Sequence, residues 1–455
     1  MRLTINRSNG KYGPSITDPS CYYDRDAQRW FHIALTLDRV GTTSALSGKN
    51  HVDIAVSTTP NPLGPWLLYK LPVQNDGTDG TPNHNCGGPC LGDYPHIGAD
   101  ANGIFITTNE FSLFGPGFFG AQIYALSKQA LASGAQSVGA ALIDTGDPSI
   151  PFPGFTVWPA ISSGGVYAGE AGGTEYFLSS LAVFTNDGTS NQILLWSVSN
   201  TKSLNSPSPA LSLSGKYINV TTYGVPPDSD QESGDYPLGQ CLSDKAIKTP
   251  AGLGCWRYFF ASGGPFANVE KHVASNDSRM QQVSFANGKV WSALDTAVTV
   301  GGATKAGIAY YALDPRSGNV FQQGFVAVEN NNVTYPAIAV DGSGRGVMAF
   351  TLLGADHYPS AAYTSIDEKI GAGEIHVAAE GAGPDDGFTG YNPYGGSPRW
   401  GDYGAAVSDG SFFWIASEYI GQTCTLSQYL ATGFTCGGTR TSLGNWDTRI
   451  TKLIQ

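Results

Sequence analysis

Two aspartates and two arginines stand just ahead of strand-like runs in this chain of 455 residues: Asp93, Asp402, Arg279 and Arg399. Carboxylates can supply a general acid, a base or a nucleophile, and a guanidinium can bind a substrate carboxylate through two parallel hydrogen bonds. His96 follows Asp93 by three residues and adds a candidate base. These residue types predict a site for a neutral or anionic sugar, with Asp93, Asp402 and His96 catalytic and both arginines binding substrate.

Each of these aspartates also has a structural interpretation. Asp in a turn commonly accepts hydrogen bonds from the backbone amides that follow it. An arginine and an aspartate can likewise pair with each other and plug the site. The sequence leaves both alternatives open.

The residues belong to a short sequence motif, called the phrase below, that recurs along the chain. Such recurrence indicates a repeat architecture. The copies are Asp18-Pro19, Asp93-Tyr94-Pro95, Val157-Trp158-Pro159, Ser278-Arg279-Met280, Thr334-Tyr335-Pro336 and Gly401-Asp402-Tyr403. Because the inner strands of a ring start at a common face, residues from distant copies should meet at one mouth of its channel. Trp158 and Tyr335 are expected to line that mouth, and their alternative role is to fill space between repeats.

Four β-branched or aromatic runs, separated by turn-forming residues, follow most copies, which is the strand signal. The sequence therefore predicts an all-β fold, a single domain over residues 1–455 that forms a six-bladed β-propeller. The last unit has only three runs: Ala405–Ser408, Phe412–Ser417 and Trp446–Leu453. Arg2–Asn6 is expected to pair beside Trp446–Leu453, which would close the ring without a free strand edge.

A loop insertion at about residues 222–274 lengthens the interval between two successive copies of the phrase. Gly234-Asp235-Tyr236-Pro237 repeats the phrase inside it, so seven blades is the alternative count. The insertion also contains an acidic run, and alternating oxygen ligands with a glycine can fold around calcium. The expected calcium ligands are Asp228, Asp230, Glu232 and Asp235. A catalytic carboxylate over the channel and a solvated acidic loop are the alternatives, and no other cofactor is expected.

The amino-acid composition limits the classes of partner and the cellular compartment that can be expected. The net charge of −12 argues against nucleic acid, whose binders carry basic faces. No apolar stretch approaches the ~20 residues that span a membrane, and the amino end is not expected to act as a charged-then-apolar leader. Six of seven cysteines form local pairs that predict disulfides, Cys86–Cys90, Cys241–Cys255 and Cys424–Cys436, with Cys21 left over. An extracellular, secreted protein is expected.

The chain resembles the sialidase-like six-bladed propeller superfamily in its phrase-led four-stranded units. The stretch from Arg399 to Tyr403 resembles one found in secreted propellers, which adds Trp400 and Tyr403 to the expected substrate-binding residues. The resemblance implies an arginine triad, of which Arg279 and Arg399 would be two members. The Ser-x-Asp-x-Gly-x-Thr-Trp turns of sialidases are not matched, and no Tyr–Glu nucleophile pair is identifiable.

Three functions remain open at this stage. The first is a secreted carbohydrate-active enzyme, a glycoside hydrolase or polysaccharide lyase acting on a glycan at the channel mouth. The second is a non-catalytic propeller that binds glycan or protein, and the third is a structural or assembly protein. An enzyme needs two carboxylates, or a base and an arginine, in one pocket, whereas a binder needs only aromatic walls. Substrate linkage and oligomeric state are not specified by the sequence.

Overall fold

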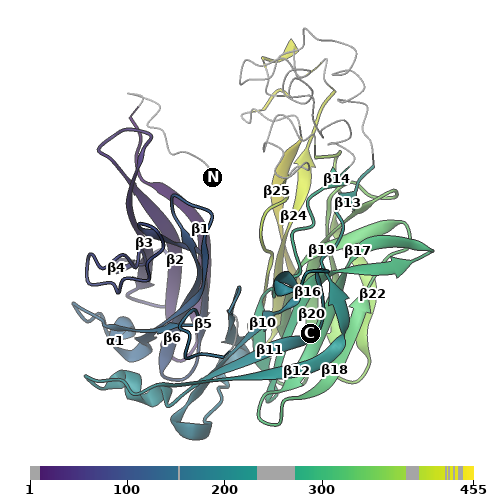
Figure 1. Ribbon diagram of the computed structural model, residues 1–455. Helices are drawn as coiled ribbons and strands as arrows, with labels where there is room; N and C mark the ends of the chain where they lie inside the picture. The colour runs from purple at the N-terminus through teal and green to yellow at the C-terminus, as the bar shows by residue number, and fades with distance from the viewer. Residues whose placement is uncertain are drawn as a thin grey trace.

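The computed structural model describes residues 11–151, 154–232, 272–385, 399–425 and 444–454, with a few residues between 428 and 438. Nearly all of the regular structure is β-strand, which confirms the all-β prediction (Figure 1). Among the described residues, no helix has the length and apolar character needed to cross a bilayer.

Five stretches of the described chain form antiparallel meanders of four strands, in which sequence order equals spatial order. The first two are β1 (Ser15–Asp24), β2 (Arg29–Arg39), β3 (Leu46–Ser57) and β4 (Trp66–Pro72), then β5 (Cys90–Ala99), β6 (Gly103–Ser112), β7 (Phe118–Ser127) and β8 (Ala140–Asp144). The third is β9 (Trp158–Ser162), β10 (Thr174–Ser180), β11 (Thr189–Ser199) and β12 (Ser212–Gly224). The fourth and fifth are β15 (Val283–Ala286), β16 (Lys289–Val300), β17 (Ala303–Asp314) and β18 (Asn319–Val326), then β19 (Asn331–Val340), β20 (Arg345–Gly354), β21 (Ser360–Asp367) and β22 (Gly371–Ala379).

A final meander has three described strands, β23 (Ala405–Ser408), β24 (Phe412–Gln422) and β25 (Asn445–Ile454). Colour in Figure 1 follows this succession from the purple β1–β4 to the yellow β24 and β25. A two-stranded ribbon of β13 (Ser229–Asp230) and β14 (His272–Val273) stands at the root of the insertion. Short helical segments connect some strands: α1 (Lys128–Ser133) and the 3₁₀ turns Ser163–Gly165, Glu170–Gly172, Ala182–Phe184 and Thr201–Asn205.

The first strands of neighbouring meanders lie side by side. β9 pairs in parallel with both β5 and β15, which joins three meanders into one 12-stranded sheet. Gly98 permits this approach, because a Cβ there would lie only 2.5 Å from Pro159 Cβ and 2.6 Å from the Ala160 carbonyl oxygen. The first strands of these three meanders are therefore neighbours within one sheet.

Burial falls from the first strand of a meander to the last. Every residue of β19 is buried, whereas in β22, in the same meander, Gly371 is the one buried residue and the others are partly buried or exposed. A strand covered on both faces needs apolar or hydrogen-bonded residues throughout, and a strand with one wet face alternates. Trp196, Trp291 and Phe350, three of the largest buried side chains, lie on second or third strands, between neighbouring meanders.

The recurring phrase adopts an unusual backbone. Four non-glycine residues within or beside it have positive φ: Asp18 at 52°, Tyr94 at 30°, Thr156 at 47° and Tyr335 at 57°. The strand register of β1, β5 and β19 shifts at the same places, so the phrase forms a β-bulge there. Left-handed backbone is costly for residues other than glycine, and such strain is concentrated at functional sites. The phrase is therefore a strained bulge in the first half of β1, β5 and β19.

The last described meander contacts the first. The Tyr403 hydroxyl donates a hydrogen bond to the Pro19 carbonyl at 3.0 Å, so the last meander touches the first. The run predicted at Trp446–Leu453 lies within β25, which pairs with β24. Arg2–Asn6, the expected closing strand, lies outside the described residues, as does Gly234–Pro237, so ring closure and the blade count stay predictions.

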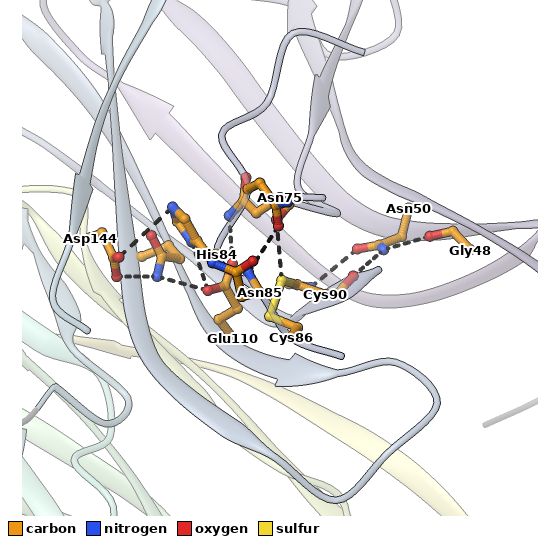
Figure 2. Close-up of a disulfide and its surroundings, with 12 residues drawn as sticks. Gly48, Asn50, Asn75, His84, Asn85, Cys86, Cys90, Glu110 and Asp144 are labelled. Carbon is orange, nitrogen blue, oxygen red and sulfur yellow. Dashed lines mark hydrogen bonds and ion pairs between the residues drawn. A yellow bond between two sulfur atoms is a disulfide. The ribbon is translucent and has the colours of Figure 1, made fainter. Parts of the chain in front are cut away.

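The described cysteines follow the predicted pairing. Cys86 is bonded to Cys90 (Figure 2), Cys424 is bonded to Cys436, and Cys21 is free. Both disulfides are local. Cys86–Cys90 joins a loop to the first residue of β5, and Cys424 and Cys436 lie outside the strands. Cys241 and Cys255 lie outside the described residues.

Candidate functional site

The starts of the first strands bring distant residues together. Tyr94 lies 6.2 Å from Tyr403 between ring centroids, and Trp158 lies 6.3 Å from Tyr403. The Arg279 guanidinium lies 5.3 Å from the centre of the Tyr94 ring. Residues that precede β15 and β23, begin β9 or lie at the bulge of β5 therefore share one region, which we call the strand-start site.

Three aspartates from three meanders share this site. Burial, then the charges of Asp93 and Asp402, raises the pKa of Asp18 from 3.8 to about 6. Burial, with Asp402 adding to it, also raises the pKa of Asp93, although its carboxylate accepts a hydrogen bond from the Tyr94 amide at 3.0 Å. Both oxygens of Asp402 accept hydrogen bonds from Arg399, whose side chain is 45% exposed. The site thus gathers more negative charge than Arg399 alone can neutralise.

Glu418, on β24, is a fourth carboxyl group in the same region. Burial, then the charge of Asp402, raises its pKa from 4.5 to about 7. Gly401 has φ of +53°, and a Cβ there would lie 2.4 Å from a Glu418 oxygen, so only glycine lets the phrase approach this carboxyl group. A small pocket, about the size of one water molecule, adjoins Glu418 and Asp402. Its lining residues are Tyr335, Thr351, Trp400, Asp402, Tyr403, Gly404, Ser417 and Glu418.

Arg279 makes an internal ion pair. Its Nε and Nη2 donate to the two carboxylate oxygens of Asp277 at 2.8 and 2.7 Å. Its guanidinium also lies 5.3 Å from the centre of the Phe155 ring. The fork that would grip a substrate carboxylate is therefore occupied by Asp277, and a role of Arg279 in binding would use its remaining donors or its charge.

His96 and Trp158 lie beneath the carboxylates rather than at the surface. Their rings stack at 3.6 Å between centroids, and only 4% of His96 and 7% of Trp158 is exposed. Burial, then the charge of Arg279, lowers the pKa of His96 well below 6.5, so the imidazole is neutral at physiological pH. The structure places both as packing beneath the site, and their predicted catalytic and binding roles stay predictions.

Tyr335 and Trp400 are also buried, with hydrogen bonds that fix their orientation. The Tyr335 hydroxyl donates to the Ala274 carbonyl at 2.8 Å, and the Trp400 indole N–H donates to the Thr351 hydroxyl at 3.0 Å. Val273 packs with both in one cluster, so the described root of the insertion lies against the site. Of the predicted binding aromatics, Tyr403 is the most accessible, being half-buried.

A row of partly exposed phenylalanines extends outward from Arg279. Phe155 contacts Phe118 at 5.6 Å and Phe184 at 6.2 Å between ring centroids, and Phe118 contacts Phe111 at 5.2 Å. Phe184 is 43% exposed. Aromatic faces beside a polar site are suited to stacking on sugar rings, so this row extends the surface that a ligand can contact.

The expected calcium ligands are only partly described. Asp230 forms ion pairs with His272 and Lys305, both at 3.3 Å, which uses its carboxylate. Asp228 and Glu232 are exposed, and Asp235 lies outside the described residues. In the part of the chain that the structure describes, the groups with metal-ligand spacing do not include these acids. Calcium at this run stays a prediction.

Sequence reasoning did not assign Asp18, Glu418 or Asp277 to the site. Asp18 stands in the first copy of the phrase, so its position was a usable signal. Glu418 carries a weaker signal, an acidic residue within the apolar strand from Phe412 to Gln422. Asp277 precedes Arg279 by two residues, and only the fold shows that it closes back onto the guanidinium.

No family model and no curated protein matches the sequence. Solved structures are similar in fold at low scores. A protein of unknown function from Dyadobacter fermentans has a TM-score of 0.44 at 12% identity, over 97% of this chain and 95% of that one. An endo-arabinase from Bacteroides thetaiotaomicron has 0.35 at 11%, over 80% and 96%. A GH43 β-1,3-galactosidase has 0.33 at 13%, over 81% and 92%.

Proposed function

We propose that the chain is a secreted six-bladed β-propeller that hydrolyses glycosidic bonds at the strand-start site. The observation that supports this most directly is the pair Glu418 and Asp402. A glycosidase needs one carboxyl group that is protonated near neutral pH and a second that is a carboxylate. The pKa of Glu418, raised to about 7 by burial and by Asp402, suits it to the first role.

In this mechanism Glu418 donates its proton to the glycosidic oxygen as the bond to the anomeric carbon breaks. Asp402 then either removes a proton from the attacking water or attacks the anomeric carbon itself, after which water releases the sugar. One water is consumed in either route. When Asp402 is the nucleophile, the water that releases the sugar returns a proton to Glu418; when Asp402 is the base, it keeps the proton of the water, and exchange with solvent restores both groups. Asp18 and Asp93 border the site and would accept hydrogen bonds from sugar hydroxyls.

A hydrolase is favoured over a polysaccharide lyase. A lyase needs an accessible base beside the carbon that loses its proton, together with positive charge on the uronate. His96 is almost fully buried, and Arg279 is paired with Asp277. The strand-start site is instead rich in carboxyl groups, which suits an acid and a nucleophile or base.

A non-catalytic glycan-binding propeller is the second candidate, and one observation favours it. Both arginines at the site are paired with aspartates, and the adjoining pocket accommodates only about one water. A sugar would then lie on the open mouth and the row of phenylalanines, without entering a deep cleft.

The deciding experiment screens purified protein against plant, fungal and bacterial polysaccharides for released reducing ends and for unsaturated uronates. We expect reducing ends from at least one polysaccharide, and their loss in Glu418→Gln. Glu380→Gln, which removes an exposed carboxylate on another meander, is the matched control and should keep full activity. Retention on a glycan without any release would establish the binding function instead, and unsaturated products would establish a lyase.

A further inference from the structure

A second polar cluster lies in the second meander, beside the Cys86–Cys90 disulfide. The connection from β4 to β5 folds back on itself: the His84 amide donates to the Asn75 carbonyl at 2.9 Å, and the Cys90 amide donates to the Gln74 carbonyl at 2.7 Å. The disulfide closes the end of this loop (Figure 2). The loop thereby places His84 and Asn75 against the strands β6 to β8.

Three ligand-type side chains converge there. His84 Nδ1 lies 2.8 Å from Glu110 Oε2, and His84 Nε2 lies 3.8 Å from Asp144 Oδ2. One ligand atom from each residue lies within 4.8 Å of the others. Zinc bonds to nitrogen and oxygen of ~2.0–2.1 Å separate tetrahedral ligand atoms by roughly 3.3 Å. Because Glu110 and Asp144 lie beside different ring nitrogens, the imidazole would rotate so that one nitrogen shares the ion with both carboxylates. Figure 2 shows all three side chains directed toward one another.

Two buried amide groups border the same cluster. Asn75 Nδ2 donates to Glu110 Oε1 at 2.5 Å, and Gln122 Nε2 donates to Asp144 Oδ1 at 2.6 Å. Asn75 is 1% and Gln122 0% exposed, yet Asn75 Oδ1 and Gln122 Oε1 have no hydrogen-bond partner. Buried carbonyl oxygens rarely lack a partner. Rotation of either amide would direct its free oxygen at the cluster, where a cation would satisfy it.

The charge of the cluster points the same way. The Glu110 side chain is 1% exposed and that of Asp144 25%, so two carboxylates face each other with little water. Burying like charges is costly unless a cation neutralises them. Within the described part of this loop and meander, His84 is the only group at the cluster that could carry a positive charge. A divalent ion would balance both carboxylates and leave His84 neutral.

We propose that His84, Glu110 and Asp144 bind one divalent transition-type cation, with Asn75 or Gln122 completing the coordination. The mixed nitrogen and oxygen ligands favour Zn²⁺ over Ca²⁺, which prefers oxygen alone. Cys86 and Cys90 also lie beside Glu110, but as a disulfide they offer no thiolate. The ion would lock the β4–β5 loop onto β6 and β8, and this role is independent of sugar hydrolysis.

The test measures Zn²⁺ binding to the full chain after removal of metal with a chelator, without reductant, because reduction would create two thiolate ligands. We expect one Zn²⁺ per chain by titration calorimetry, a raised melting temperature, and a visible absorption band when Co²⁺ replaces Zn²⁺. Glu110→Gln and His84→Ala should each weaken Zn²⁺ binding by at least ~100-fold, since even outer-shell changes cost 10–100-fold.

His51→Asn is the matched control, because His51 also lies near two carboxylates, those of Asp38 and Asp53 at 3.9 and 3.3 Å. It should leave the stoichiometry unchanged. Absence of Zn²⁺ binding to wild type overturns the proposal, and so does binding that persists in both variants. If Glu110→Gln fails to fold, the partly exposed His84 position and the Co²⁺ spectrum of wild type still decide the question.

Discussion

Aspartates stand at both ends of the inner strands, and they behave differently at the two ends. At the far ends, each caps the turn that follows. Asp100 accepts hydrogen bonds from the amides of Asn102 and Gly103, Asp341 from those of Ser343 and Arg345, and Asp409 from those of Ser411 and Phe412. At the strand-start site, Asp18, Asp93 and Asp402 face each other, Glu418 and Arg399 instead.

Backbone geometry explains this difference. A tight turn after a strand presents amides toward the preceding carboxylate, which satisfies it. The bulges inside β1, β5 and β19 contain the left-handed residues Asp18, Tyr94 and Tyr335. Asp93 accepts from the next amide, and within the described chain Asp18 and Asp402 have no such bond. The larger cavity is not at the strand-start site. A hollow of about 290 Å³ lies at the far ends of the inner strands, against Asp341 and Arg345. Ligand chemistry is expected where carboxylates lack backbone partners.

The largest expected effect is on turnover, and it should distinguish Asp402 from Asp409, the two aspartates that flank the strand β23. Asp402→Asn should lower turnover of the identified glycan by about 10²–10⁴-fold, the usual contribution of an acid–base group. Asp409→Asn should keep turnover within twofold, because the amide oxygen can still cap Ser411 and Phe412. Steady-state kinetics with melting curves checks both. Equal losses would remove the distinction between the two ends, and an unfolded Asp402→Asn would make Asp402 structural.

The next effect concerns pH and Glu418. Its folded-state pKa of about 7 exceeds 4.5, so the folded state binds the proton more tightly than the unfolded state. Stability is then greatest below about pH 4.5 from this group and decreases as pH rises to about 7, by on the order of 3 kcal/mol. Glu418→Gln removes this cost, so it should be more stable than wild type at pH 8 and similar at pH 4.5.

Denaturant titrations of wild type and Glu418→Gln at both pH values measure this difference. Activity should fall above pH 7 as the acid loses its proton. A variant less stable than wild type at pH 8 would show that the Glu418 carboxylate is stabilised by a partner, and would contradict its role as a buried acid.

The repeated phrase allowed the fold class and the convergence of distant residues to be predicted, because strand order in a meander is a local property. What each residue does at the corner was not predictable. Arg279 and Asp277 are two positions apart, and their pairing depends on a backbone turn that the sequence does not reveal. Trp158 and Trp400 were expected to bind substrate, with space filling as the alternative for Trp158, and the structure has both side chains buried. Glu418 stands on a second strand and has no phrase to mark it.

A smaller effect is expected for the caps at the far ends. Asp341→Ala leaves the amides of Ser343 and Arg345 without their acceptor, and should cost about 1–2 kcal/mol of unfolding free energy. Asp341→Asn keeps an acceptor oxygen and should change stability by less than about 0.5 kcal/mol. Both variants should hydrolyse glycan normally. If Asp341→Ala abolished activity without loss of stability, the 290 Å³ hollow would be a ligand site and the comparison of the two ends would fail.

The smallest effect is expected midway along β1, where Cys21 stands three residues from both Asp18 and Asp24. Cys21 is a free, exposed cysteine, so Cys21→Ser removes neither a disulfide nor a core contact. Surface substitutions of this kind usually change stability by less than about 0.5 kcal/mol. Turnover should also be unchanged if the substrate contacts only the starts of the strands. A Cys21→Trp variant sharpens the test, because a bulky ring there would obstruct a glycan that reached along the inner strand toward Asp24. Activity retained in Cys21→Ser but lost in Cys21→Trp, at equal melting temperature, would extend the binding surface from the strand starts to the middle of the strand.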